Sequence, residues 1–310
     1  MVSILANLFV KGAVGSDIGT SRSNNQDNYY LNGKFAEYSI NIQTSTAFQS
    51  PVEDGVFAVF DGMGGQSKGE FASLCASKVL DNHKANILKY GIKQIHRFVN
   101  DANEKICDEM RKENERIGST LAVLTVTDNI AQAYNLGDSS IYYISKNKIT
   151  KLTRDHTVAE QMYRMNVLTK EEASHDVRKH RLTKHLGMFA EESDLRPYAS
   201  ANIRVNNGDM FLLCTDGITN SVNENEIKRI ITTFDGRCKQ TVNALIEKAI
   251  ENGSQDNLTA MVLRIVNSTN SNTIRSQLRR HPRLYPFLLG VGISTLIFVS
   301  IIAVMLSRFT

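Results

Sequence analysis

Three aspartates carry the clearest sign of chemistry in this chain. Asp61 and Asp216 each follow a short apolar run and precede a glycine, and Asp256 lies next to Asn257, just before another apolar run. A carboxylate is costly in an apolar interior, whereas acids at the rim of a sheet can converge on hard cations, which prefer oxygen ligands. Two such cations about 3.5–4 Å apart can activate a water and clamp a phosphoryl group. The pattern therefore predicts a divalent-metal site.

The elements that must position these acids are strands. Apolar or β-branched runs occupy residues 56–60, 121–126, 141–144, 210–214 and 258–266. A single Asp-Gly pair after a strand is most often only a turn. Several of them after apolar strands, with further glycines at Gly64 and Gly65, favour the metal site, because glycine lets the backbone approach a ligand closely.

Helical periodicity flanks the strands. Apolar residues recur at three- and four-residue steps within residues 71–79, 92–110 and 242–250, which predicts amphipathic helices that pack on sheets. Two helices early, a block of strands and helices late indicate α+β layering rather than alternating βαβ units.

Residues 157–187 interrupt the strand pattern with a polar, charged, helical stretch. The stretch is too long for a simple connection and too polar for a core, which predicts a flap or small subdomain over a site. Four histidines lie in or beside it, at positions 156, 175, 180 and 185. Their spacing fits no standard zinc signature, so they are expected to be solvated flap residues.

Composition excludes several classes of protein. The chain has 310 residues, of which 42% are hydrophobic and 22% charged, as in ordinary folded proteins. Four scattered cysteines without a CxxC pair argue against a zinc ribbon or a dense disulfide framework. The net charge of +4 depends on five arginines that lie after position 266, where no acid occurs. The preceding part has one acid more than it has basic residues, so no nucleic-acid partner is expected.

The C-terminal part is expected to anchor the protein in a membrane. Residues 284–306 are apolar over a length that suffices to cross a bilayer as a helix, and residues 267–283 form a polar, then basic linker. Four arginines precede the span and one follows it, in the tail 307–310. The positive-inside rule then predicts a single-pass protein of the cytoplasmic (inner) membrane, with its folded part in the cytoplasm.

Six motifs, taken together, resemble a known family. They are RSNNQD (22–27), FDGMGG (60–65), GST (118–120), LGDS (136–139), CTDGIT (214–219) and SQDNLT (254–259). In this order they are similar to the metal-dependent Ser/Thr protein phosphatases of the type 2C class, and in particular to bacterial members. The resemblance runs from about residue 15 to 266. It implies a phosphatase domain over residues 1–266, with a four-layer α-β-β-α sandwich of two antiparallel sheets flanked by helices.

The resemblance also implies a set of metal ligands for two Mn²⁺ or Mg²⁺ ions. Asp61, Asp216 and Asp256 would hold the first ion. Asp61 would bridge to the second ion, which takes the carbonyl of Gly62 and is supported by Asp27, directly or through water. The position of Asp138, together with Asp216, matches a third and weaker metal of bacterial members.

Other residues receive roles from the same resemblance. Arg22 would grip the substrate phosphate through its planar fork, and Asn257 would orient Asp256 or the waters on the metals. Position 63 is Met where many eukaryotic members carry a histidine that is proposed as general acid, so leaving-group protonation is expected to fall to water. Position 26 is Gln where other members carry an acid, which leaves Asp27 to serve the second metal.

The resulting hypothesis is a membrane-anchored phosphatase that hydrolyses phosphoserine and phosphothreonine by a metal-activated water. Its partners would be phosphorylated proteins, among them a cognate Ser/Thr kinase or that kinase's substrates. A catalytically silent scaffold that binds a phosphoprotein or kinase at the membrane is the alternative, although the intact set of acids argues against it. Hydrolysis of a small phosphoester is a third possibility.

Overall fold

The computed structural model describes residues 8–37, 44–64, 68–146, 148–189, 191–192 and 194–267. Leu8–Val266 forms one compact unit. Within the described residues no helix has the length and apolar character needed to cross a membrane. The predicted membrane span, the tail and all of the predicted linker except Asn267 lie outside the described residues.

Two six-stranded sheets form the centre of this unit. The first has the order β10 (Lys148–Lys151), β9 (Ser140–Ser145), β13 (Met210–Cys214), β14 (Leu258–Asn267), β1 (Leu8–Asp17) and β3 (Thr44–Val52). The second has the order β11 (Tyr198–Ala199), β8 (Ile130–Leu136), β7 (Leu121–Thr127), β4 (Gly55–Phe60) and β2 (Asn28–Leu31), with β12 (Ile203–Arg204) also on β8. Every pair whose register is described is antiparallel, for example β4 with β7 and β13 with β9.

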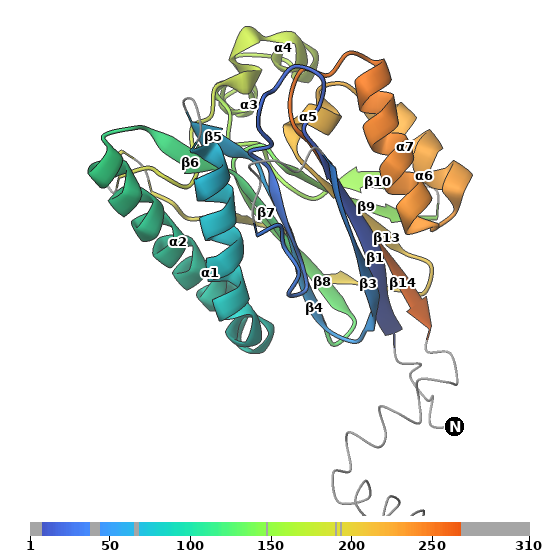
Figure 1. Cartoon of the computed structure of the whole chain (residues 1–310). Coiled ribbons are helices and arrows are strands. Elements are labelled where there is room, and N and C mark those ends of the chain that lie inside the picture. The colour runs from blue at the N-terminus through green and yellow to red at the C-terminus, as the bar shows by residue number, and fades with distance from the viewer. Residues whose placement is uncertain are drawn as a thin grey trace, which may run out of the picture. The chain divides into compact units, whose positions relative to one another are not determined.

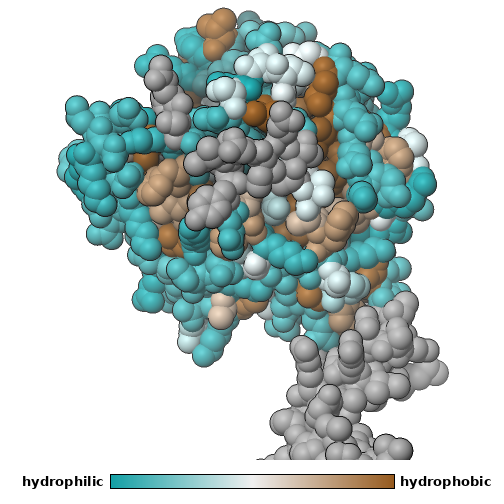
Figure 2. Space-filling view, viewed as in Figure 1, coloured by the Kyte–Doolittle hydropathy of each residue, from teal (hydrophilic) through white to brown (hydrophobic). Residues whose placement is uncertain are grey.

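Helices cover the outer face of each sheet (Figure 1). They are α1 (Gly69–Tyr90) and α2 (Ile92–Glu113) on the second sheet, and α6 (Glu224–Phe234) and α7 (Cys238–Glu251) on the first. One apolar cluster lies under each helix pair, and a third lies between the sheets. This confirms the four layers and the antiparallel sheets that the sequence predicts. The visible face is mainly hydrophilic over both helical layers, with apolar residues between them (Figure 2).

Strand β4 shows why the central strands read as continuous apolar runs. All six of its residues are buried. Val56, Ala58 and Phe60 pack in the cluster under α1 and α2, while Phe57 and Val59 pack between the sheets. Because successive side chains point to opposite faces, a strand covered on both sides needs apolar residues throughout. This burial fixes the end of β4, and therefore the position of Asp61.

The predicted strands are present with small shifts at their ends, as in β14, and so is helix α2. Helix α1, by contrast, runs eleven residues beyond the predicted end at position 79. The predicted helices do not include α6. Its start nevertheless carries a capping box, in which Asn223 accepts from the backbone N–H of Glu226 and the Glu226 carboxylate accepts from the backbone N–H of Asn223. The buried isoleucines of α6, at positions 227, 230 and 231, follow the three- and four-residue steps of an amphipathic helix, so the sequence carries a helical signal here.

The stretch 157–187 contains three short helical elements: α3 (Val158–Arg164), α4 (Lys170–His175) and the 3₁₀ helix η1 (Val177–His180). Thr157 caps α3, and Thr169 caps α4 in a capping box with Glu172. Beyond them the chain passes β6 (Ile117–Ser119), which pairs with β5 (Gly62–Gly64); Ser119 exchanges backbone hydrogen bonds with Leu186. The expected polar helical subdomain is therefore present.

Candidate metal centre

The strand registers bring the predicted acids to one end of the sandwich. Asn28 pairs with Phe60, so Asp27 and Asp61 flank the same end of the β2–β4 pair. Cys214 pairs with both Ser140 and Ala260. Asp138, Asp216 and Asp256, which lie two to four residues beyond these pairs, therefore share the corresponding end of the other sheet.

The five carboxylates repel one another. Burial raises the pKa of Asp61 well above its ordinary range, and the charges of Asp27, Asp216, Asp138 and Asp256 raise it further. Burial and the charge of Asp216 also raise the pKa of Asp138 to about 8. Like charges gathered in a partly desolvated site favour proton uptake or a cation. The sequence-predicted acids are thus close enough to act on each other electrostatically.

Two threonine hydroxyls orient Asp27. Its Oδ2 accepts hydrogen bonds from Thr215 Oγ1 at 2.8 Å and from Thr259 Oγ1 at 2.7 Å. Asp27 is only 3% exposed, and burial raises its pKa to about 7 although the two hydroxyls oppose that shift. Both threonines belong to the motifs around Asp216 and Asp256, but their type alone did not indicate this role.

A second pair of hydroxyls joins the loops of Asp61 and Asp138. Thr120 Oγ1 accepts from the backbone N–H of Asp61 at 3.1 Å, and the Thr120 backbone N–H donates to the Asp61 carbonyl at 2.9 Å. The same Oγ1 lies 2.7 Å from Ser139 Oγ. These buried contacts fix the backbone of both acids, and sequence reasoning missed them as well.

Arg22 lies against one of the acids rather than free in the cleft. Its Nε and Nη2 donate to the two oxygens of Asp256, both at 2.9 Å. Among the described residues, no group of three or more His, Cys, Asp or Glu side chains is placed to hold a metal ion. The bidentate pair with Arg22 engages both oxygens of Asp256, which is a predicted ligand.

Asn257 has different partners from those expected. Its side-chain amide donates to the carbonyls of Ile18 and Asn24, and its Oδ1 accepts from the backbone N–H of Gln26. The side chain therefore holds the loop that carries Arg22. Only its backbone N–H bonds to Asp256, at Oδ1 and 2.9 Å.

The chemistry of the donors, rather than their spacing, fits a divalent cation. Asp216 Oδ2 accepts from Asn220 Nδ2 at 2.9 Å, whereas Asp216 Oδ1 is buried without a hydrogen-bond partner. An orphaned buried carboxylate oxygen is rare because it costs free energy. Oxygen ligands from several carboxylates, one of them unsatisfied, are what Mg²⁺ or Mn²⁺ requires.

Two cavities meet at Asp216. One, of about 360 Å³, is lined by Asp138 and by flap residues that include Glu160 and His180. The other, of about 490 Å³, is lined by Arg22 and Asp256. Asp138, Asp216 and Asp256 therefore line an open cleft, with the flap on one side and the Arg22 loop on the other.

His156 is not the solvated flap residue that its spacing suggested. Its Nδ1 accepts from the backbone N–H of Gly137 at 3.1 Å, and its own backbone N–H donates to the Gly137 carbonyl at 3.0 Å. Burial lowers the pKa of His156 to about 4, and the charges of Lys184 and Arg154 lower it further. The imidazole is therefore neutral at physiological pH.

This neutral histidine makes a pH-dependent contribution to stability. Its folded pKa of about 4 lies below the ordinary 6.5, so the proton binds mainly to the unfolded chain. The contribution is complete above pH 6.5 and is lost as the pH falls toward 4. Between pH 7.5 and 5.0 we expect the wild type to lose about 2 kcal/mol more unfolding free energy than His156→Asn. Asparagine can accept the same hydrogen bond without titrating.

Urea denaturation in EDTA at the two pH values measures this difference. The acids of the metal centre titrate equally in both proteins and cancel in the comparison. Equal losses in the two proteins would show that the imidazole is not held neutral.

Comparisons with known proteins agree with this site. The family model described as protein phosphatase 2C matches residues 40–262. Protein phosphatase PhpP of Streptococcus pneumoniae is 29% identical over 262 residues, which cover 80% of this chain and 94% of PhpP.

Two solved structures are also similar to this chain. The Ser-Thr phosphatase MsPP of Mycobacterium smegmatis, solved in complex with cacodylate, is 27% identical with a TM-score of 0.65, and the match covers 81% of this chain and 97% of MsPP. The catalytic domain of the phosphatase PstP, solved with two manganese ions, shares the fold at 24% identity and a TM-score of 0.67, over 84% of this chain and all of that domain. The chain belongs to the protein phosphatase 2C family, the metal-dependent serine/threonine protein phosphatases.

Proposed function

We propose that this protein removes phosphate from phosphoserine and phosphothreonine of cytoplasmic proteins while anchored in the inner membrane. Its ligands for Mn²⁺ or Mg²⁺ would be Asp27, Asp61, the carbonyl of Gly62, Asp138, Asp216 and Asp256, for two ions and a weaker third. The observation that carries the proposal is the convergence of five repelling carboxylates, with an unsatisfied Asp216 oxygen, beside an open cleft that three of them line.

Bound to these acids, the metal ions would supply a Lewis acid for the phosphoryl oxygens and a water of lowered pKa. The protein's own part is to hold the acids in place. Thr215 and Thr259 fix the orientation of Asp27, and Thr120 fixes the backbone of Asp61. Such preorganisation lowers the cost of reorganisation during the reaction.

Arg22 can hold the substrate phosphate without leaving Asp256. The pair with Asp256 uses Nε and one hydrogen of Nη2. A guanidinium has five N–H donors, so Nη1 and the second hydrogen of Nη2 remain for a phosphate. Arg22 is exposed and borders the cavity on its side of the cleft. Its position therefore supports phosphate capture next to the acids.

Hydrolysis of p-nitrophenyl phosphate tests the catalytic part of the proposal. We expect turnover with Mn²⁺, near-complete loss with EDTA, and recovery when Mn²⁺ is added in excess, because the carboxylates alone cannot stabilise a phosphoryl group. Phosphopeptides should be better substrates than phosphorylated metabolites. No Mn²⁺-dependent turnover would favour the silent scaffold, and a preference for metabolites would favour a small-phosphoester hydrolase.

The membrane part of the proposal rests on the sequence of residues 284–306 and its arginine flank. We expect the chain cut before Leu284 to be soluble and as active as the full chain, because all predicted ligands precede residue 267. Sedimentation of cell membranes, followed by activity assays on both fractions, measures this. A truncated protein that still sediments with membranes would contradict the anchor.

The proposed partners are phosphorylated proteins, including a cognate Ser/Thr kinase or its substrates. The family supports this class of substrate, and the balance of one excess acid before Asn267 gives no support to a nucleic-acid partner. Comparison of phosphoproteomes with and without the active protein would identify the substrates.

A further inference from the structure

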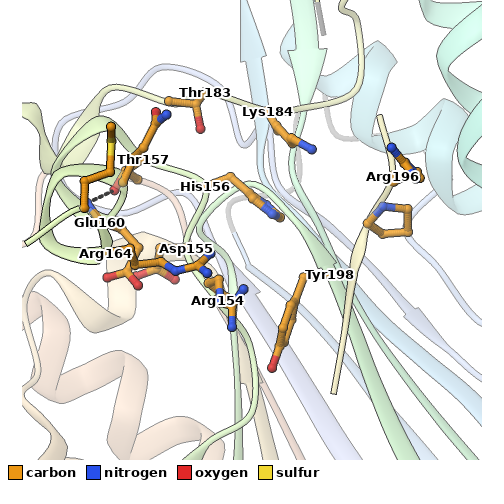
Figure 3. A pocket seen from close by; sticks show the side chains of 13 residues that line it. Arg154, Asp155, His156, Thr157, Glu160, Arg164, Thr183, Lys184, Arg196 and Tyr198 are labelled. Carbon is orange, nitrogen blue, oxygen red and sulfur yellow. Dashed lines mark hydrogen bonds between the residues drawn. The ribbon is translucent and has the colours of Figure 1, made fainter. Parts of the chain in front are cut away.

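A second pocket lies beside the catalytic cleft on the far side of the flap helix α3. It has a volume of about 670 Å³ and is formed by α3, the segment before it, the segment after η1, and the segment leading into β11 (Figure 3). Asp155, Thr157 and Glu160 line both this pocket and the cleft that contains Asp138 and Asp216. A chain bound across α3 could therefore occupy both spaces. We call this space the flap pocket.

The flap pocket is rich in unpaired positive charge. Its basic side chains are Arg154, Arg164, Lys184 and Arg196. Arg196 pairs with Asp194, but within the part of the chain that the structure describes no ion pair engages the other three.

The two acids of the flap pocket do not cancel this charge. Both oxygens of Asp155 lie 2.7 Å from Lys151 Nζ, so that carboxylate is already paired. Glu160 is the acid that remains, against three free cations. A pocket with this excess of positive charge favours an anion.

Arg154 is positioned rather than merely exposed. The Arg154 guanidinium lies over the Tyr198 ring, 4.5 Å from its centroid, which occupies one face and leaves the N–H edge free. The backbone of Arg154 is clamped by the buried Asn135, whose Oδ1 accepts from the Arg154 N–H and whose Nδ2 donates to the Arg154 carbonyl. Planar guanidinium groups held in this way suit the oxygens of a phosphate.

His156 completes the flap pocket as a neutral donor. Because Nδ1 accepts from Gly137, the proton of the neutral ring lies on Nε2. Figure 3 shows the imidazole projecting between Lys184 and Tyr198. Arg154, Arg164 and Lys184 each act to lower the pKa of His156, as expected for cations near the ring.

We propose that the flap pocket binds a second phosphate group of the substrate protein, so that the enzyme prefers chains phosphorylated at two nearby sites. One phosphate lies at the acids of the cleft, and the other lies among Arg154, Arg164 and Lys184. This deepens the proposed phosphatase function and rests on it. An extended chain rises about 3.3 Å per residue. Two phosphorylated residues that lie three to six positions apart are therefore separated by about 10–20 Å.

The test uses the full chain in detergent micelles and pairs of phosphothreonine peptides. One member of each pair carries, three to six positions away, a phosphonate analogue of phosphoserine that cannot be hydrolysed, and the other carries serine. We expect kcat/KM for the phosphonate member to be about tenfold higher at the best spacing, mainly through KM. The double variant Arg164→Gln, Lys184→Gln should abolish that preference and keep p-nitrophenyl phosphate turnover.

Arg181→Gln is the matched control. Arg181 is an exposed cation of the same flap that does not line the flap pocket, and its loss should leave the preference intact. Equal kcat/KM for both peptides in the wild type would overturn the proposal, as would a preference that survives the double variant. Equal kcat/KM for the two peptides is also the result expected if the flap pocket binds free phosphate instead.

Calorimetric titration with the same peptides separates this proposal from the proposed function. If p-nitrophenyl phosphate is not hydrolysed at all, the phosphatase proposal fails. Tighter binding of the phosphonate peptide to the wild type than to the double variant would still support the flap pocket. Equal binding to both proteins would overturn it.

Discussion

Asp61→Asn is expected to abolish phosphatase activity and to be more stable than the wild type without manganese but less stable with it. We expect kcat to fall on the order of 10³-fold, beyond the roughly 10–100-fold that is typical when a residue behind a metal ligand is lost. In EDTA the variant should unfold at a higher urea concentration than the wild type, because burial and four neighbouring acids raise the pKa of Asp61 and make its charge unfavourable. With Mn²⁺ the order should reverse, because only the wild type gains the free energy of metal binding.

Urea denaturation with and without Mn²⁺ measures both halves of this prediction. Asp108→Asn is the control, since Asp108 is an exposed acid on α2 whose ion pair, in the part of the chain that the structure describes, is the surface pair with Arg111. Such pairs contribute at most about 1 kcal/mol, so neither activity nor the manganese response should change. An Asp61→Asn protein that Mn²⁺ stabilises as strongly as the wild type would remove Asp61 from the ligand set.

Gly62→Ala should destabilise the domain by about 3 kcal/mol, at the upper end of the usual cost of overpacking. A Cβ at position 62 would lie 2.2 Å from the carbonyl oxygen of Gly69 and 2.3 Å from that of Gln26. Both are backbone atoms that cannot rotate away. Relief of the clash would displace β5 and the carbonyl proposed as a ligand, so the affinity for Mn²⁺ should fall together with stability.

Gly208→Ala separates crowding from the intrinsic cost of replacing glycine. Gly208 has a φ of +93° and no atom within 4 Å of an added Cβ, so its substitution is expected to cost about 1–2 kcal/mol from backbone strain alone. Urea denaturation of both variants gives the comparison. If Gly62→Ala lowers the unfolding free energy no more than Gly208→Ala does, the backbone at Gln26 and Gly69 does not crowd position 62.

The layers and the position of the acids could be predicted from the sequence for a physical reason. Strands that are buried on both faces must be apolar along their whole length. The end of such a strand is therefore visible in the sequence as the point where the apolar run gives way to polar residues. Asp61 and Asp216 lie at such ends, and the sheet registers bring them together. Helix α6 escaped prediction although Ile227, Ile230 and Ile231 and the capping box at Asn223 mark it in the sequence.

The contacts within the site could not be predicted, because they join segments that are far apart in the chain. Asp27 is held by Thr215 and Thr259, and Arg22 by Asp256, across 188 to 234 positions. Nothing in the local sequence of a threonine indicates which distant carboxylate it will contact. His156 shows the same limit, since its neutral state depends on the Gly137 backbone and on the neighbouring cations.

The bonds of Asn257 to the carbonyls of Ile18 and Asn24 have a consequence for biosynthesis. The ribosome makes these partners at opposite ends of the domain, so the Arg22 loop cannot be fixed until β14 has emerged. Contacts of such long sequence separation form late and slowly. A nascent chain therefore has no phosphatase activity for most of its synthesis. Fragments that end before β14 are likewise expected to leave phosphoproteins unchanged.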